Sequence, residues 1–273
     1  TVLMARAGTT SSSGTISVAG GSVLEYASGT HTFTGVTVSG AGALKVSGAA
    51  LTYAGASSTT DLQLTGGTLT VGTGATVATT NLALSGGTLA GAGQLSLSGA
   101  GSTWSGGAFS GNLRVAPGAT LTLNGGTKNW RSGAALTNEG TVAWSLGTID
   151  GTTGGGTSTI TNASGALFDI QGDMLLTYLN DNPGTSTHTL TFNNQVGAEL
   201  RRSVGTGTLT LGGAAPDDVM LFNLNNAGAV NVNTGTVLLA LGGFASGTNS
   251  GVIDIGSLAT LSTNGAALIN SVT

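Results

Sequence analysis

A repeat with a period of 20 constrains this chain more than any other feature of its sequence. The segment 61–80 reads DLQLTGGTLTVGTGATVATT, and 81–100 follows without a gap as NLALSGGTLAGAGQLSLSGA. Within each repeat, apolar residues alternate with polar ones between breaks such as Gly-Gly and Gly-x-Gly. A period of two is typical of strands, and glycine reaches backbone angles that other residues avoid. Each repeat therefore predicts three short strands and three corners, which is one rung of a triangular coil.

The corners are evenly spaced along the chain. Gly-Gly recurs at positions 66, 86, 106 and 125, so that the last step is shorter than the first two by a single position. If the rungs lie about 4.8 Å apart, like neighbouring strands, their apolar residues form columns inside the coil. One rung buries too few apolar side chains to offset the entropy of ordering its glycines, so stability requires several stacked rungs. We therefore expect an all-β fold, a right-handed parallel β-helix, which is a β-solenoid.

From about Leu136 onward a second kind of repeat replaces the first. An apolar residue, any residue, Asn, one or two residues and Gly precede alternating apolar residues, at 136–144, 160–170, 192–200, 224–232 and 247–255. Their glycines, at 140, 165, 197, 228 and 251, are more widely spaced than the Gly-Gly corners, which indicates larger rungs with inserted loops. The predicted loops are rich in the turn formers Gly, Asn, Asp and Pro and span 149–158, 178–188 and 212–220. Asparagine amides can bond from rung to rung, which predicts an asparagine ladder.

The two kinds of repeat suggest one continuous domain. We interpret 1–135, with its Gly-Gly corners, and 136–273, with its Asn-Gly rungs, as a single β-solenoid. Because the rungs of the second half are irregular, a β-roll or a stack of two sheets is an alternative there. The segment around Gly14 resembles the segment around Gly251, and no polar cap is visible at either end. Since a free solenoid end normally needs a cap, we expect both ends to be covered by more chain or by another copy.

Composition excludes several classes of function. Only 7% of the residues are charged and 49 are Gly, yet 39% are hydrophobic and the mean hydropathy is +0.29, which argues against a disordered polar tract. Seven basic residues and a net charge of −4 cannot supply a surface that follows nucleic acid phosphates. No apolar run is long enough for a membrane-spanning helix. Cys is absent, which excludes disulfides and thiolate metal sites. The start of the chain contains no signal peptide pattern, so we expect a mature product or a fragment.

Two motifs carry a family resemblance. The rung NEGTV at 138–142 and the rung LSGGTL at 84–89 resemble the repeats of giant bacterial surface proteins of the filamentous-haemagglutinin and autotransporter-passenger class. The resemblance extends over nearly the whole chain and concerns the class, not one protein. It implies a right-handed parallel β-helix, secretion to the cell exterior, and a role in adhesion or surface structure. The N-terminal secretion domain of the haemagglutinin family is not recognisable in this sequence.

Acidic residues are the first candidates for catalysis. Glycosidases need two carboxylates roughly 5–9.5 Å apart, a distance that neighbouring rungs could supply. The best local cluster is Asp169 with Asp173, while Asp150 and Asp181 lie in nearby predicted loops. Asp169, however, aligns with Arg201 in the next Asn-type rung, which favours an outward pair across neighbouring strands. We therefore assign no catalytic residue.

The remaining candidates also favour structural roles. His31 and His188 lie far apart without Cys or His at ligand spacing, so no metal site is expected. The segment 179–184 lacks the acidic pattern of a calcium loop, and the glycines at 151–156 precede no Lys-Ser/Thr pair of a phosphate-binding loop. Trp104 and Trp144 fall in predicted core columns, and only Trp130 stays open as a sugar-stacking platform.

These observations favour an extracellular structural or adhesive β-solenoid of a bacterial surface protein, forming a stiff rod or an end-to-end filament. We expect no enzyme activity and no cofactor. The main alternative is a carbohydrate-active β-helix enzyme, either a lyase or a tailspike-like glycosidase. An ice-binding solenoid is a minor alternative, because the ladder of Thr68 and Thr70 meets Ala90 one rung later. The expected partners are further chain or a second copy end to end, and a host-surface or polysaccharide ligand.

Overall fold

The computed structural model describes residues 2–5, 8–151, 155–177, 186–214, 218–239, 246–263 and 267–270. Within these ranges the secondary structure consists of strands, and no helix is present. The strands stack in parallel as coils, which confirms the predicted β-solenoid. The chain divides into two compact units, Thr1–Thr122 and Leu123–Thr273. The expected continuity of 1–135 with 136–273 as one domain stays a prediction.

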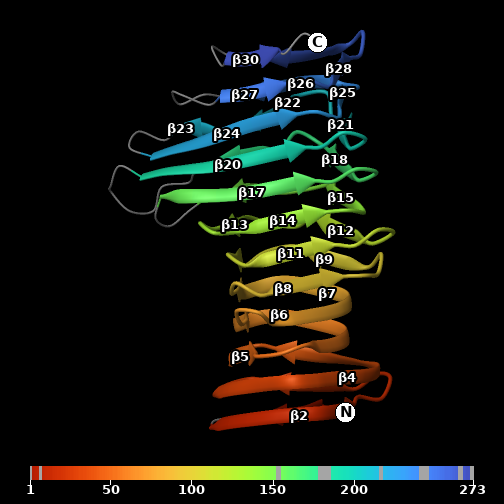
Figure 1. The fold of residues 1–273 in the computed structure, drawn as a ribbon, viewed down its shortest axis with the longest axis vertical. Helices are drawn as coiled ribbons and strands as arrows, with labels where there is room; N and C mark the ends of the chain where they lie inside the picture. The colour runs from red at the N-terminus through yellow and green to blue at the C-terminus, as the bar shows by residue number, and fades with distance from the viewer. Residues whose placement is uncertain are drawn as a thin grey trace. The chain divides into compact units, whose positions relative to one another are not determined.

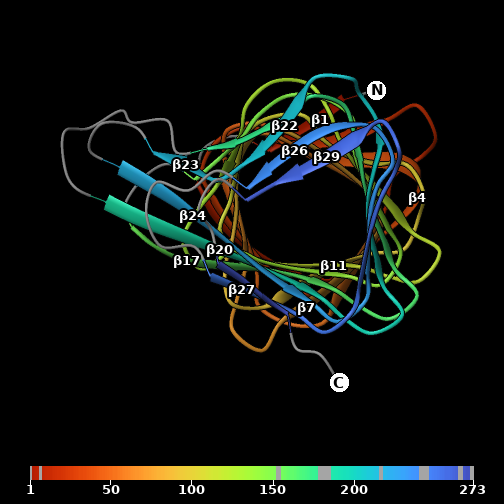
Figure 2. The same cartoon turned by 90° about the horizontal axis from the view of Figure 1, so that it is seen from above.

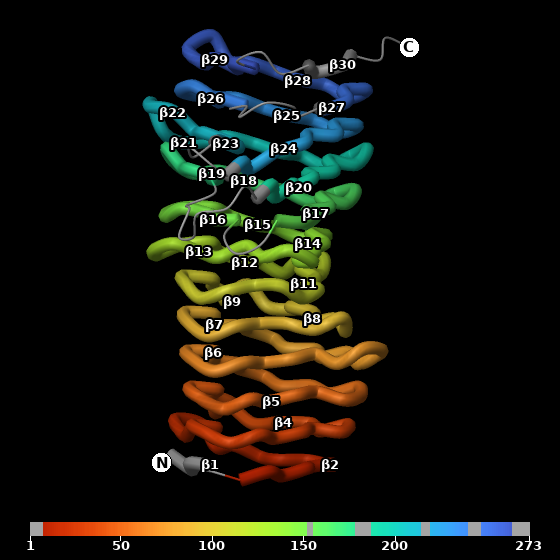
Figure 3. Tube along the Cα trace, turned by 90° about the vertical axis from the view of Figure 1, so that its left-hand side faces the viewer, coloured from red at the N-terminus to blue at the C-terminus, as the bar shows by residue number. Residues whose placement is uncertain are grey.

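Unit 1 is a stack of parallel strands that follow the sequence repeat (Figures 1 and 3). Its strands, with β12 crossing the division, are β1 (Val2–Ala5), β2 (Thr9–Ser17), β3 (Val23–Tyr26), β4 (Thr30–Val46), β5 (Ala50–Tyr53), β6 (Ser57–Val71), β7 (Thr76–Ala90), β8 (Gln94–Leu97), β9 (Ser102–Trp104), β10 (Ala108–Phe109), β11 (Asn112–Val115) and β12 (Thr120–Leu123).

Residues that are one sequence repeat apart are register partners in the stack. Leu62 lies opposite Leu82, and Leu84 lies opposite Trp104, each one repeat further along the chain. The buried apolar residues of the 61–80 repeat fall into three alternating pairs, Leu62/Leu64, Leu69/Val71 and Ala75/Val77, which confirms the three sides of this rung. Apolar columns therefore fill the interior of this unit.

The corners differ from the prediction of three separate strands per rung. β6 and β7 each continue through two corners, including Gly66 and Gly67 in β6. Gly67 adopts φ 68°, which turns the chain, and the ladder to the next rung resumes after a register shift between Thr65 and Thr68. Because these glycines bend the backbone without ending its pairing, one strand serves three sides of the rung.

Unit 2 contains the larger rungs. Its strands are β13 (Lys128–Trp130), β14 (Ala135–Asn138), β15 (Thr141–Trp144), β16 (Ile149–Asp150), β17 (Gly156–Asn162), β18 (Leu167–Gln171), β19 (Leu175–Thr177), β20 (Ser186–Asn194), β21 (Glu199–Val204), β22 (Thr208–Leu211), β23 (Gly213–Ala214), β24 (Asp218–Asn226), β25 (Ala229–Val232), β26 (Gly235–Leu239), β27 (Ser246–Asn249), β28 (Val252–Ile255), β29 (Ala259–Ser262) and β30 (Ala267–Asn270). β17, β20, β24 and β27 stack in this order with their asparagines in register, and three strands recur per rung.

The inserted loops are shorter than predicted, because strands begin inside them. β17, β20 and β24 include 156–158, 186–188 and 218–220, which the sequence placed in loops. We call these three segments the wing, and Figure 2 shows that the strands carrying them extend outward from the coil. Buried and more exposed residues alternate through 187–192, and Thr is favoured in strands. The pairing of β20 with β24 therefore extends beyond the coil. β23 adds the antiparallel pairing of the wing, against β24. The other parts of these loops at 152–154, 178–185 and 215–217 lie outside the described residues.

Candidate functional site

A ladder of asparagines, buried at all but its last position, runs along the inside of unit 2. The side-chain nitrogen of each residue donates to the side-chain oxygen of the next, at 2.8, 2.9, 2.8 and 2.7 Å, from Asn138 through Asn162, Asn194 and Asn226 to Asn249. Each nitrogen also donates to a backbone oxygen, in turn that of Leu167, Glu199, Ala229 and Val252. This finding confirms the predicted ladder. Buried amides that are paired on both sides fix the rung register at little desolvation cost.

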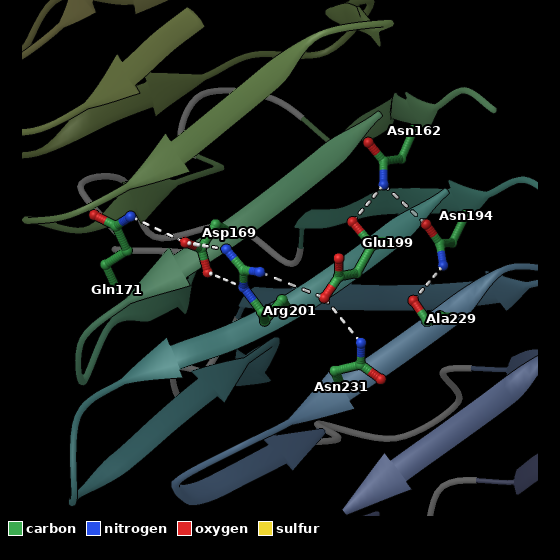
Figure 4. A network of polar contacts seen from close by, with 8 residues as sticks. All are labelled: Asn162, Asp169, Gln171, Asn194, Glu199, Arg201, Ala229 and Asn231. Atoms are coloured by element: carbon green, nitrogen blue, oxygen red, sulfur yellow. Dashed lines mark hydrogen bonds and ion pairs between the residues drawn. The ribbon is translucent and has the colours of Figure 1, made fainter. Parts of the chain in front are cut away.

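A second polar network lies on the outer face of β18, β21 and β25 (Figure 4). Arg201 donates two hydrogen bonds to Asp169, at 3.1 and 3.0 Å, and Gln171 donates a third at 3.0 Å. Glu199 forms an ion pair with Arg201 at 3.7 Å and accepts from Asn231 at 2.8 Å. The register places Asp169 opposite Arg201, and Arg201 opposite Asn231, which confirms the predicted outward column.

The electrostatics of Asp169 suit an ion pair and not a general acid. Burial by itself would raise the pKa of Asp169, but hydrogen bonds from Arg201, Gln171 and Ser203 together hold it below its ordinary value. A general acid needs the opposite, a carboxyl whose pKa is raised toward neutrality. Asp169 is therefore ionised and neutralised by Arg201 at neutral pH.

The second predicted carboxylate faces a different arginine. Asp173 pairs with Arg202 at 2.5 Å and accepts the backbone N–H of Gly207 at 3.1 and 3.0 Å. Arg202 is 2% exposed and also donates to the backbone oxygens of Gly207 and Thr236. Asp169 and Asp173 thus have separate arginine partners and do not share one site. Asp150 is buried in β16, and Asp181 lies outside the described residues.

A shallow groove borders the outer network. It has a volume of about 540 Å³ and is lined by small residues at three successive corners, with Glu199 and Asn231 on its wall. The residues that line the bottom of the groove are small because these corners stack tightly. A Cβ on Gly251 would meet the backbone oxygen of Gly228 at 2.1 Å, and a Cβ on Gly228 would meet that of Ala198 at 2.4 Å. The groove thus places the half-buried polar side chains of Glu199 and Asn231 beside a hollow in the surface of unit 2.

No family model, no curated protein and no solved structure matches this chain. The fold and the residue contacts are therefore the basis for any functional conclusion. Within the described ranges, no helix is long and apolar enough to cross a membrane. Nor do those ranges contain a group of three or more His, Cys, Asp or Glu side chains that could hold a metal ion.

The histidines occupy two different environments. His31 is buried in unit 1, and both of its ring nitrogens are within hydrogen-bond distance of oxygens, at 2.7 Å from Thr10 Oγ1 and 2.9 Å from the Ser28 backbone oxygen. In unit 2 the Nε2 of His188 lies 2.8 Å from Ser158 Oγ, a distance typical of a nucleophile and its base. Ser158 is 3% exposed and His188 is 0% exposed, so a substrate has no access to this pair in the described structure.

The aromatic and threonine candidates lie in structural positions. All three tryptophans, Trp104, Trp130 and Trp144, are buried. The predicted core positions of Trp104 and Trp144 are thereby confirmed, and Trp130 offers no exposed face for stacking on a sugar. Thr68 lies opposite Thr88, but Thr70 lies opposite Ala90, so the flat threonine ladder of an ice-binding face is interrupted as the sequence indicated.

Sequence reasoning missed two buried cations. Arg202 lies between Ile170 and Val232 in an otherwise apolar column of unit 2. Lys128 is buried, and its Nζ donates to the backbone oxygens of Asn124, Gly126 and Leu146 at 2.9, 2.8 and 2.9 Å. Burial lowers the pKa of Lys128 to about 8. Lys128 satisfies carbonyl groups that have no partner in a strand ladder, whereas Arg202 donates to the corner carbonyl of Gly207 and to the carbonyl of Thr236 in β26.

Proposed function

We propose that this chain is an extracellular structural or adhesive β-solenoid of a bacterial surface protein. The observation that supports the proposal is the use of its polar side chains. In unit 2 the buried asparagines bond from rung to rung, and Asp169 and Asp173 are neutralised by arginines. These groups stabilise the stack and leave no free acid and base facing a common cleft among the described residues. In this proposal the chain acts mechanically, as a stiff element that resists unfolding.

The composition supports export. The absence of Cys, the low charge and the abundance of Gly, Ser and Thr are compatible with an exposed surface protein in an environment where thiols would oxidise. The resemblance of NEGTV and LSGGTL rungs to bacterial surface repeats points in the same direction. A host-surface receptor or a polysaccharide is the ligand class that an adhesive role requires, and the groove beside Glu199 is the place where we expect it to bind.

We further propose that another rung stacks on β28 and β29, either from further chain or from a second copy. Ile255 lies opposite Val232, which is an inward position of unit 2. Val232 is 2% exposed, whereas Ile255 is 43% exposed, so the inward surface of this rung is open. Parallel strands with an unpaired edge accept further strands readily.

Electron microscopy of the purified chain at increasing concentration tests this proposal. We expect particles that lengthen along one axis, and we expect Ile255→Lys to prevent the lengthening because it places a charge in the apolar contact. Asp254→Lys is the matched control, since Asp254 lies on the outer face opposite Asn231 and should leave the lengthening unchanged. Wild-type particles that keep one length at every concentration would contradict the stacking of copies.

A further inference from the structure

The wing contains a buried histidine with one unsatisfied ring nitrogen. His188 is in register with Gly156 of β17 and with Met220 of β24, and it is fully buried. Its Nε2 lies 2.8 Å from the hydroxyl of Ser158, but its Nδ1 has no hydrogen-bond partner in the described structure. A neutral imidazole tolerates this arrangement, because Nε2–H can donate to Ser158 while Nδ1 stays an unprotonated acceptor. This tautomer is assigned from the hydrogen-bond network, because it leaves no buried N–H of the ring without an acceptor.

Protonation changes this balance. A proton on Nδ1 creates a second N–H donor without a partner and a positive charge in an apolar site, and both are costly. The groups that face the ring from neighbouring strands are Ser158 and Met220, and Gly151 follows directly after β16. Of the two strands paired in parallel with β20, β17 contains no charged residue and β24 begins with Asp218, while Asp150 precedes Gly151; desolvation is the cause that lowers the pKa of His188.

We propose that His188 makes the wing a pH-sensitive element: protonation releases the ends of β17, β20 and β24, while the asparagine-lined coil of unit 2 stays folded. The boundary between the two parts follows from the contacts. The wing is stabilised by Ser158, His188 and Met220, whereas the coil half of the same strands ends in the ladder at Asn162, Asn194 and Asn226. Asparagine does not titrate, so acid leaves the ladder intact.

The direction of the effect follows from linkage. Burial lowers the pKa of His188 from 6.5 to about 4. The open wing exposes the ring to water and restores the ordinary pKa, so the open state binds more protons between these values. The closed wing is therefore most stable relative to the open wing above pH 6.5, and this stability decreases as the pH falls. The equilibrium constant for opening rises by about 100-fold between pH 7 and pH 4.

Hydrogen exchange of backbone amides tests the proposal directly. After correction for the intrinsic pH dependence of exchange, the protection of amides 187–190 should fall by about 100-fold between pH 7 and pH 4. Amides 192–194 of the same strand should keep their protection. In His188→Gln, which retains a donor for Ser158 but does not titrate, amides 187–190 should show no such fall. His31→Gln is the matched control, because His31 is buried with both nitrogens near oxygens, and the fall at 187–190 should persist.

Three results would overturn the proposal. One is an equal loss of protection at 187–190 and at 192–194, which indicates global unfolding of the unit. Another is a fall at 187–190 that persists in His188→Gln. Should His188→Gln fail to fold, the ring protons of wild-type His188 give the answer by nuclear magnetic resonance. The chain has two histidines, so the signals are readily assigned, and titration of His188 near pH 6.5 with a closed wing would exclude the mechanism.

Discussion

Replacing Asn194 by alanine is expected to lower the free energy of unfolding of unit 2 by about 3–5 kcal/mol, since a buried group left without its partner costs roughly 1–3 kcal/mol. Asn194 donates to Asn226 at 2.8 Å and to the Ala229 backbone oxygen at 2.9 Å, and it accepts from Asn162 at 2.9 Å. The truncation removes all three bonds and leaves a cavity, which adds to the cost. Denaturation by guanidinium, followed by circular dichroism, measures the change.

The neighbouring residue supplies the control for this prediction. Asn193 points outward and accepts one hydrogen bond, from Asn225 at 3.0 Å. Water can replace that bond, so Asn193→Ala should cost no more than about 1 kcal/mol. Equal losses for Asn193→Ala and Asn194→Ala would show that the inward ladder does not stabilise the coil.

The second large effect is expected at a corner of unit 1. Gly87 has φ 67°, and a Cβ there would lie 2.7 Å from the Gly67 backbone oxygen and 2.7 Å from the Gly66 carbonyl carbon. Gly87→Ala therefore adds steric overlap, about 1–3 kcal/mol, to the left-handed strain of about 1–2 kcal/mol. Because the obstacles are backbone atoms of the neighbouring rung, they cannot move without separating the rungs. Thermal unfolding should show a clear fall in the midpoint temperature.

Gly74 separates the two contributions to that cost. It has φ 74°, but a Cβ there would meet nothing within 4 Å. Gly74→Ala should therefore show the left-handed strain alone, about 1–2 kcal/mol. If the two variants were equally destabilised, close contact between rungs at the Gly-Gly corner would not be a determinant of stability.

Much of the fold could be predicted because equivalent positions of successive repeats pair with each other in neighbouring rungs. Leu62 and Leu82 occupy the same place in successive repeats of the sequence, and the structure pairs them and their neighbours at that spacing. The asparagine ladder was predictable for the same reason, since Asn precedes Gly at the same place in each large rung. Asp169 and Arg201 could be paired by aligning those rungs.

The parts that were missed involve charge and strand ends. Arg202 follows Leu200 at the alternate position, and Lys128 precedes Trp130 in the same way, so their spacing already indicated inward side chains. Their charge argued against burial, because the carbonyl groups that accept from them come from other parts of the chain, whose proximity residue spacing does not reveal. The pairing of Asp173 with Arg202 depends on such a corner. The Asn and Pro residues before His188 predict a loop there, whereas the alternation of strand β20 already includes His188.

Disulfide formation between introduced cysteines tests the stacked register of the repeat most directly, because the chain contains no native Cys. Gln63 and Ala83 are register partners on the outer face of β6 and β7. Neighbouring strands lie about 4.8 Å apart, which is within the range of Cα separations that a disulfide spans. Gln63→Cys combined with Ala83→Cys should lose its free thiols under mild oxidation. Gln63→Cys combined with Ala78→Cys should keep them, because Ala78 lies opposite Ser58 and Ser96. Free thiols in the first pair, or equal oxidation of both pairs, would contradict the stacked fold.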